Sequence, residues 1–495
     1  MLHTAHHRLL KLSHWVAAGA LVALLSACGG GGGDAGPLAS TLPGSLPPGG
    51  TPTVNLPGSG SPTAVTITAT GPARAIAGVV YTYSASASNG ASITWAWGDG
   101  SANSVGNSVK KQWSKPGTYT ATASGQALAT AGVVVTGAPL SISTAGGHTC
   151  ALKPNGTVSC WGENFAGQLG NGLLVDSGTP VTVTGVSSAV AVAAGNGYSC
   201  AHNANGTVSC WGQGFFGQLG NNSTNASTVS VAVNGLTDTV ALSVGGSHAC
   251  ALRAAGRVSC WGANGSGQLG NGNTTQSTVP VAVVGLTDAT SIAAGANQSC
   301  AVRTGGSVVC WGSNFFGQLG NNDFGDPSVT TTQVVSGLSD AVALALGGDH
   351  SCALRATGSV VCWGGNFTGQ LGNNTITQSI TPSAVQGLTD AVAISAGASQ
   401  TCALRSSGAM ACWGNNAAGR LGDGSASATA RVPVAVSSLA DGSYITTGAA
   451  HTCALRSTGA VSCWGDNSGG QIGKGTTTGT FNVPQDTLPG PVYWK

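Results

Sequence analysis

Charged residues are scarce in this sequence, and glutamate is almost missing. Only 6% of the 495 residues are Asp, Glu, Lys or Arg, and Glu163 is the single glutamate. The net charge is +2 and no basic run is longer than Lys110-Lys111, so the chain lacks the positive surface by which proteins attract nucleic acid. Polarity comes instead from Ser, Thr, Asn and Gln, and the 80 glycines predict many turns.

Apolar runs long enough to cross a membrane as a helix are also missing. The apolar segment Trp15 to Leu25 is too short to span a bilayer, and it follows the basic residues Arg8 and Lys11, as in a signal peptide. The next residues, Leu25-Ser26-Ala27-Cys28, resemble the lipobox of bacterial lipoproteins. That resemblance implies cleavage before Cys28 and lipidation of its thiol, whereas an ordinary signal peptide with a chance cysteine is the alternative.

The residues around Cys28 also predict a location. Gly29 follows the cysteine, and by the same resemblance a residue other than Asp favours the outer membrane, on its periplasmic side or at the cell surface. We therefore expect residues 1–27 to be a signal peptide and the lipid on Cys28 to attach the protein to a bacterial cell envelope. Residues 28–62 are rich in Gly, Pro and Ser and predict a flexible linker.

Residues 63–137 predict a small β-sandwich. Segments such as Val80-Tyr81-Thr82-Tyr83 have the composition of strands. The segments 95–101 (Trp-Ala-Trp-Gly-Asp-Gly-Ser) and 113–120 (Trp-Ser-Lys-Pro-Gly-Thr-Tyr-Thr) resemble the signature of polycystic-kidney-disease-type (PKD) domains, which are Ig-like sandwiches. We expect Trp95, Trp97 and Tyr119 to lie in its core, and we favour a turn role for Asp99 over metal binding.

Residues 138–495 form an array of seven repeats of 50 to 52 residues. Each repeat has two cysteines ten residues apart, and Trp-Gly follows the second cysteine every time. The cysteine pairs are Cys150 and Cys160, Cys200 and Cys210, Cys250 and Cys260, Cys300 and Cys310, Cys352 and Cys362, Cys402 and Cys412, and Cys453 and Cys463. Repeats of this length that are rich in β-formers predict an all-β chain with a seven-bladed β-propeller after the sandwich.

The third repeat illustrates the strands that we expect. They are residues 241–244, 248–253, 257–261 and 279–284, with a long loop before the last strand. A glycine in the turn between the second and third strands recurs in all seven repeats, as a left-handed turn position requires.

The repeat resembles the regulator of chromosome condensation repeat family. The residues that carry the resemblance are Gly-Gly-x-His-x-Cys-Ala-Leu, followed by Gly-x-Val-x-Cys-Trp-Gly and by Gly-Gln-Leu-Gly in the long loop. The family's propellers have seven blades, and the paired cysteines resemble its secreted bacterial branch. The nuclear member exchanges nucleotide on a small GTPase, a partner that we do not expect a lipoprotein to meet.

Each cysteine pair is expected to form a disulfide. With the turn centred on residue 255, Cys250 and Cys260 lie opposite each other across the hairpin. The fourteen cysteines that remain after Cys28 are therefore seven pairs, in a compartment that permits oxidation. Zinc sites and free thiols are the alternatives, but zinc sites favour shorter spacings.

Two further sets of positions recur. Two residues before the first cysteine, the repeats have His148, Tyr198, His248, Gln298, His350, Gln400 and His451. We expect hydrogen bonds between blades at this position. We do not expect a metal site, because three of the seven residues are Tyr or Gln and not His.

The second set consists of charged residues at the ends of strands. Basic residues follow the second strand (Lys153, Arg253, Arg303, Arg355, Arg405, Arg456), and Asp238, Asp288, Asp340, Asp390 and Asp441 precede the first. Because the basic and acidic residues lie at the same face, we expect ion pairs, with an anion site as the alternative.

The opposite face has the long loops, and aromatic residues gather in them. They are Phe165, Phe215, Phe216, Phe315, Phe316 and Phe367. Aromatic side chains framed by small polar ones predict a binding face for a protein or glycan, and packing between neighbouring loops is the alternative.

No catalytic motif, cofactor motif or metal motif is found in the sequence. We therefore expect a monomeric, non-catalytic binding or adhesion scaffold of the cell envelope. The alternatives are an inhibitor of a secreted or periplasmic enzyme, as a relative of the family blocks β-lactamase, and nucleotide exchange by family resemblance alone.

Overall fold

The structure is a computed structural model that describes residues 67–487 except 71–73, 77–79, 99–100, 113–116, 125–127, 137–140 and 458. The signal segment, Cys28 and the linker therefore lie outside the described residues. The chain divides into two compact units at the boundary between Leu140 and Ser141. Within the described part, no helix has the length and apolar character needed to cross a membrane.

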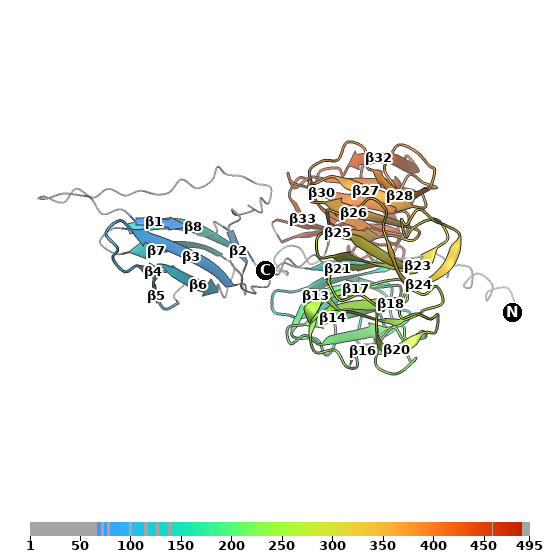
Figure 1. Cartoon of the computed structure of the whole chain (residues 1–495), viewed down its shortest axis with the longest axis horizontal. Coiled ribbons are helices and arrows are strands. Elements are labelled where there is room, and N and C mark those ends of the chain that lie inside the picture. The colour runs from blue at the N-terminus through green and yellow to red at the C-terminus, as the bar shows by residue number, and fades with distance from the viewer. Residues whose placement is uncertain are drawn as a thin grey trace, which may run out of the picture. The chain divides into compact units, whose positions relative to one another are not determined.

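The first unit is a β-sandwich of two sheets (Figure 1). One sheet has the order β1-β3-β6 and the other β2-β8-β7-β4-β5, with β2 parallel to β8. The strands are β1 (Ile67–Thr70), β2 (Arg74–Ile76), β3 (Val80–Ala87), β4 (Thr94–Ala96), β5 (Ser104–Val105), β6 (Ser108–Gln112), β7 (Gly117–Ser124) and β8 (Leu128–Thr136).

An aromatic cluster fills the core of the sandwich. Trp95 and Trp97 are 2% and 1% exposed, and their rings stack with centroids 5.4 Å apart. Tyr83 meets both rings edge-on, so the prediction that the two tryptophans are core residues is confirmed. Asp99 and the side chain of Tyr119 lie outside the described residues, so their predicted roles stay predictions.

The second unit contains seven four-stranded antiparallel sheets, each made of four strands that are consecutive in sequence. The innermost strands are β9 (Ile142–Thr144), β13 (Ala189–Ala194), β17 (Thr239–Val244), β21 (Ala289–Ala294), β25 (Ala341–Leu346), β29 (Ala391–Ala396) and β33 (Gly442–Thr447). The second strands are β10 (His148–Leu152), β14 (Tyr198–Asn203), β18 (His248–Arg253), β22 (Gln298–Arg303), β26 (His350–Arg355), β30 (Gln400–Arg405) and β34 (His451–Arg456).

The third strands carry the Trp-Gly pairs and the fourth strands lie outermost. The third strands are β11 (Val158–Gly162), β15 (Val208–Gly212), β19 (Val258–Gly262), β23 (Val308–Asn314), β27 (Val360–Gly364), β31 (Met410–Asn415) and β35 (Val461–Asp466). The outermost are β12 (Ser177–Thr182), β16 (Ser227–Ala232), β20 (Ser277–Ala282), β24 (Asp326–Val334), β28 (Ser379–Ala384), β32 (Thr429–Ala435) and β36 (Thr480–Asp486). Two single 3-10 turns are Ala254–Gly256 and Ala417–Gly419.

At two positions of each repeat, steric constraints favour glycine over any residue with a side chain. Gly256 has φ +74° in the turn between β18 and β19, and its counterparts in the other six repeats also have positive φ. Gly262, of the Trp-Gly pair, has φ +105°, and a Cβ there would lie 2.5 Å from the carbonyl oxygen of Ser247. The register also shifts between Cys260 and Gly262, so the strand bends where its long loop begins.

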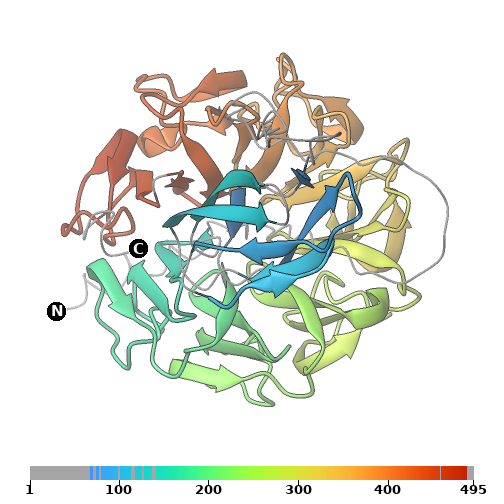
Figure 2. The same ribbon diagram turned by 90° about the vertical axis from the view of Figure 1, so that its left-hand side faces the viewer.

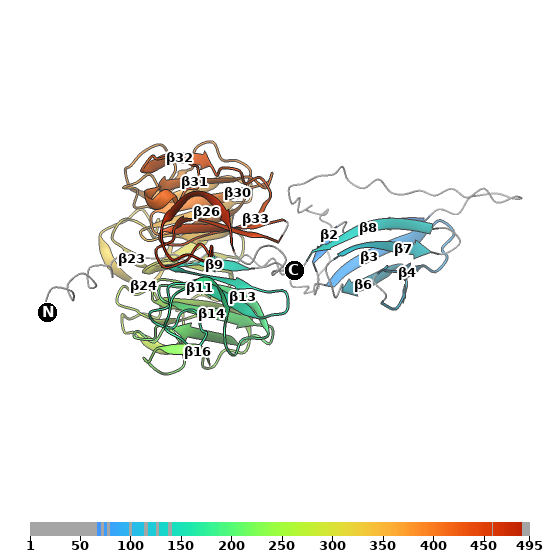
Figure 3. The same ribbon diagram turned by 180° about the vertical axis from the view of Figure 1, so that it is seen from behind.

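The seven sheets form a closed ring with the architecture of a β-propeller (Figure 2). Each innermost strand contacts the innermost strand of the next sheet, and β33 of the last sheet contacts β9 of the first (Figure 3). Residues 132–135 belong to β8 of the sandwich, so they do not supply a strand to the last sheet. Residues 491–494, the other segment considered for closure, lie outside the described residues.

The strand directions define two faces of the ring. The turn after each innermost strand and the long loop after each third strand lie on one face, which we call the long-loop face. The hairpin turns between second and third strands lie on the other, which we call the hairpin-turn face.

Candidate functional site

Each repeat is cross-linked across its central hairpin. Cys250 and Cys260 are direct cross-strand partners with Cα atoms 4.0 Å apart, and their sulfur atoms are bonded in the structure. The amide of Arg253 donates to the carbonyl of Arg257, so by alternation the cysteines occupy a non-hydrogen-bonded pair, where side chains are closest. The other six predicted pairs are bonded in the same way.

The residue two places before the first cysteine connects each sheet to the next. All seven side chains are fully buried. The four histidines use Nε2 to reach a hydroxyl of the following sheet, at 2.7–2.9 Å. Tyr198, Gln298 and Gln400 donate instead to backbone carbonyls of the following sheet. The predicted hydrogen bonds between sheets are confirmed.

The protonation of these histidines follows from their partners. The Ser299 hydroxyl donates its proton to the carbonyl of Gln268 at 3.0 Å, so His248 must donate to it through a protonated Nε2. Burial lowers the pKa of His248 to about 3, because no charged partner compensates the lost hydration of an imidazolium. Burial likewise lowers the pKa of His148 and His451 to about 3 and that of His350 to about 4. These side chains are neutral structural links.

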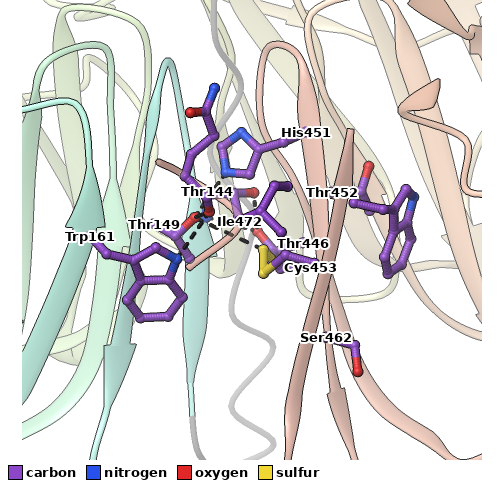
Figure 4. Close-up of a disulfide and its surroundings, with 12 residues drawn as sticks. Thr144, Thr149, Trp161, Thr446, His451, Thr452, Cys453, Ser462 and Ile472 are labelled. Atoms are coloured by element: carbon purple, nitrogen blue, oxygen red, sulfur yellow. Dashed lines mark hydrogen bonds between the residues drawn. A yellow bond between two sulfur atoms is a disulfide. The ribbon is translucent and has the colours of Figure 1, made fainter. Parts of the chain in front are cut away.

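The tryptophan of the Trp-Gly pair forms a second link between sheets. Each indole Nε1 donates to the backbone carbonyl of the long-loop residue before Leu or Ile in the preceding repeat, at 2.9–3.0 Å. The last sheet is joined to the first by the kind of bonds that join consecutive sheets. Trp161 donates to the carbonyl of Gln471, and the Thr149 hydroxyl contacts both Gln471 and His451 (Figure 4).

Five ion pairs surround the hairpin-turn face. The Nε atoms of Arg253, Arg303, Arg355, Arg405 and Arg456 lie 2.7–2.9 Å from Asp238, Asp288, Asp340, Asp390 and Asp441, respectively. The predicted pairing is therefore confirmed. Because five basic side chains are neutralised, the hairpin-turn face is a poor match for the alternative of an anion site.

In six of the seven repeats, a buried asparagine organises the long loop. In the third repeat, Asn264 donates to the carbonyls of Asn273 and Thr275 at 2.9 and 3.0 Å, and its Oδ1 accepts from the amide of Leu269. Gly214 occupies this place in the second repeat. A surface loop with such internal bonds presents its other side chains in a fixed arrangement.

Large apolar side chains stand exposed on these loops. Phe165, Phe215, Phe315 and Phe367 are 56–64% exposed, and Phe216 is 43% exposed. Phe316 is half-buried because it packs between Phe315 and Phe367, with ring centroids 4.9 and 5.2 Å away. The structure thus brings three of the six phenylalanines into one cluster.

Sequence reasoning missed other apolar residues of the same loops. Leu173, Leu174, Val175, Phe324 and Ile376 are all at least 50% exposed. They could have been found by searching the whole segment between the Gly-Gln-Leu-Gly motif and the outermost strand, for aliphatic as well as aromatic residues. In the described part of the chain, no three His, Cys, Asp or Glu side chains group as metal ligands would.

The fold and the repeated contacts define a β-propeller whose repeats are linked by tryptophan and polar side chains. The RCC1-like domain family matches residues 226–492, more than half of the chain, so the protein belongs to that family. The regulator of chromosome condensation (RCC1) repeat also matches residues 155–202 and 141–168. No curated protein sequence matches the chain.

Solved structures show the same fold. Prp20p from Saccharomyces cerevisiae is 20% identical with a TM-score of 0.60, over 70% of this chain and 87% of that chain. Human WBSCR16 is 21% identical with a TM-score of 0.60, over 68% of this chain and 96% of that one. Yeast RCC1 (Prp20) bound to Kap60 is 23% identical with a TM-score of 0.56, over 62% and 77%. At these identities the likeness concerns the fold.

Proposed function

We propose that the ring is a seven-bladed propeller that serves as a non-catalytic binding scaffold of a bacterial cell envelope. A lipid on Cys28 attaches it to the outer membrane, and a protein or glycan partner contacts the long-loop face. The sandwich is proposed to be a PKD-type spacer. The observation that carries the proposal is the set of exposed phenylalanines, of which Phe165, Phe315 and Phe367 stand on loops that a buried asparagine fixes internally.

The contrast between the two faces supports the choice of the long-loop face. Exposed aromatic side chains lose ordered water and gain packing when a partner covers them, whereas the hairpin-turn face already pairs its charges internally. The reactive residue types of the repeat also have structural roles, since its histidines connect sheets and its cysteines are bonded. This supports binding over catalysis.

Cross-linking in the cell envelope tests the proposal. The wild-type chain is compared with a variant in which Phe215, Phe216, Phe315 and Phe316 are alanine. A matched control replaces four valines of the innermost strands, near the hairpin-turn face, by alanine: Val190, Val240, Val342 and Val392, which are 37–48% exposed. We expect the phenylalanine variant alone to lose its cross-linked partner. Equal capture by all three proteins would overturn the proposal.

A further inference from the structure

One carboxylate of the long-loop face differs from the others. Asp349 lies in the turn between β25 and β26, where the other repeats have Gly147, Gly197, Ser247, Asn297, Ser399 and Ala450. Two other acidic residues lie near the equivalent turns of their own repeats, Glu163 and Asp466. Both have partners: Glu163 has a contact in the structure, and Asp466 accepts hydrogen bonds from Ser468 and Gln471.

Asp349 has no hydrogen-bond donor or cation beside its carboxylate among the described residues. The residue is half-buried, and burial raises the pKa of its carboxyl group. A carboxylate that has lost part of its hydration without gaining a partner is a cost to the folded state. A cation supplied from outside would remove that cost, because opposite charges attract strongly where water is partly excluded.

One aromatic ring, that of Phe367, borders the same gap as the Asp349 side chain, and further rings pack behind it. A methyl group added at Gly365 would lie 3.3 Å from Asp349 Cβ and 3.6 Å from Phe367 Cε2, so both side chains border one gap. Phe316 packs edge-on against Phe367 with an angle of 80° between the rings, and Phe315 packs against Phe316. Gly365 leaves the gap open, whereas the equivalent residue in four other repeats is Glu163, Gln213, Asn415 or Asp466.

The second repeat supplies a neutral counterpart. Phe165 reaches over Gly197, where an added methyl would lie 3.4 Å from Phe165 Cζ and 3.4 Å from Gln213 Oε1. The ring is present there, but the residue equivalent to Asp349 is glycine. Among the seven equivalent turn residues, Asp349 is thus the only carboxylate.

We propose that Asp349, Phe315, Phe316 and Phe367 form a recognition site for an arginine or lysine side chain of a protein partner. The carboxylate pairs with the cationic group, and the ring faces stabilise it through cation–π contacts. This rests on the proposed binding at the long-loop face and names the chemistry of the partner. The chain's net charge of only +2 gives a basic segment little long-range repulsion to overcome.

Peptide binding tests the site directly. The probe is a fluorescent six-residue peptide alternating Gly and Arg, and the same peptide with Glu replacing Arg is the charge control. Polarisation is measured with the full-length chain and with Asp349→Asn, Gly365→Ala and Val342→Ala. Asp349→Asn removes the charge at constant shape and Gly365→Ala fills the gap. Val342→Ala removes exposed apolar surface of the same repeat near the hairpin-turn face.

We expect the Arg peptide to bind the wild-type chain and the Glu peptide not to bind. Asp349→Asn and Gly365→Ala should each weaken binding at least tenfold, and Val342→Ala should change it less than twofold. Melting temperatures no lower than that of the wild type show that the variants fold. Equal binding of the two peptides, or binding by Asp349→Asn within twofold of wild type, would overturn the assignment. If Asp349→Asn weakens binding but Gly365→Ala does not, the cationic group does not occupy the gap beside Phe367, and the proposed contact with the rings is wrong.

Failure of this site and failure of the proposed function give different results. If the four-phenylalanine variant loses its cross-linked partner but Asp349→Asn keeps it, the face binds without a cationic contact and only this proposal falls. If neither variant loses the partner, the function proposed for the face falls as well, whatever the peptide does.

Discussion

At the scale of single residues, the position two before the first cysteine links one sheet to the next through three different types of side chain. His248 contacts a hydroxyl of the next sheet through its imidazole, Gln298 donates to a backbone carbonyl, and Tyr198 does the same with its phenol. The larger ring of Tyr198 is matched by a smaller residue in the following repeat. That repeat has Ala249 at the position where the other six have Ser or Thr. Glutamine is therefore a natural substitute for histidine at this position.

Buried neutral histidines make stability depend on pH. Their folded pKa of about 3 to 4 is below the value near 6.5 of the unfolded chain, so below pH 6.5 the unfolded chain binds more protons. Stability should be constant above pH 7 and fall as pH decreases from 6.5 towards 4. Each buried histidine contributes about 1.4 kcal/mol per pH unit in that window. Thermal unfolding between pH 4 and 8 measures it.

The double variant His248→Gln, His350→Gln isolates this effect. Two of the four histidines of the repeated position are removed, so its melting temperature should fall less steeply below pH 6.5 than that of the wild type. Equal slopes for the two proteins would show that the acid sensitivity has another origin.

The sequence predicted residue contacts where a pattern repeats. The Asp–Arg pairs could be inferred because Ser188 and Asn203 replace both charges together in the second repeat. Asp349 could not be found in this way, since the residue type at its position differs from repeat to repeat. Its significance lies in Phe367 and Gly365, which the fold brings beside it.

At the scale of elements, the central hairpin was predicted better than the strands that flank it. The second strand of the third repeat, His248–Arg253, has the predicted bounds, whereas the outermost strand is Ser277–Ala282 and not 279–284. The cause is the register shift between Cys260 and Gly262, after which Gly262 pairs with Ser277. Sequence periodicity cannot show such a bulge, because it depends on how two strands meet.

Removing one disulfide should destabilise the ring measurably. The Cys250→Ala, Cys260→Ala variant frees a ten-residue loop in the unfolded chain, which the loop-entropy relation values at about 3 kcal/mol. Guanidinium unfolding monitored by tryptophan fluorescence gives the change in midpoint and slope.

The same hairpin offers a matched control. In the Asp238→Asn, Arg253→Gln variant a half-exposed ion pair is lost, and such pairs contribute roughly 0–1 kcal/mol. The disulfide variant should therefore lose clearly more stability than the ion-pair variant. The reverse order would mean that the cross-link adds little to a hairpin already fixed by its neighbours.

At the scale of the whole molecule, the proposed lipidation of Cys28 predicts where the protein is found. Cys28→Ser in a bacterial host should move the protein from the membrane pellet to the soluble envelope fraction, because the acyl chains supply the membrane affinity. The seven disulfides should form unchanged, since their cysteines lie within single hairpins. Fractionation followed by immunoblotting measures the shift, and a variant that stays in the pellet would contradict lipid attachment at this residue.

The ring closes without a strand shared between its first and last sheets, because each sheet takes four consecutive strands and β9 simply meets β33. The junction uses the tryptophan contact found at every other junction and the hydroxyl contact found at five of the other six. The order of repeats along the chain is therefore arbitrary for the folded circle. A circularly permuted chain that begins at β13 and ends with β12 would need, between β36 and β9, only a connection like residues 183–188 that now join β12 to β13. Any of the seven repeats could stand first, and whole repeats are the natural units of exchange between such proteins.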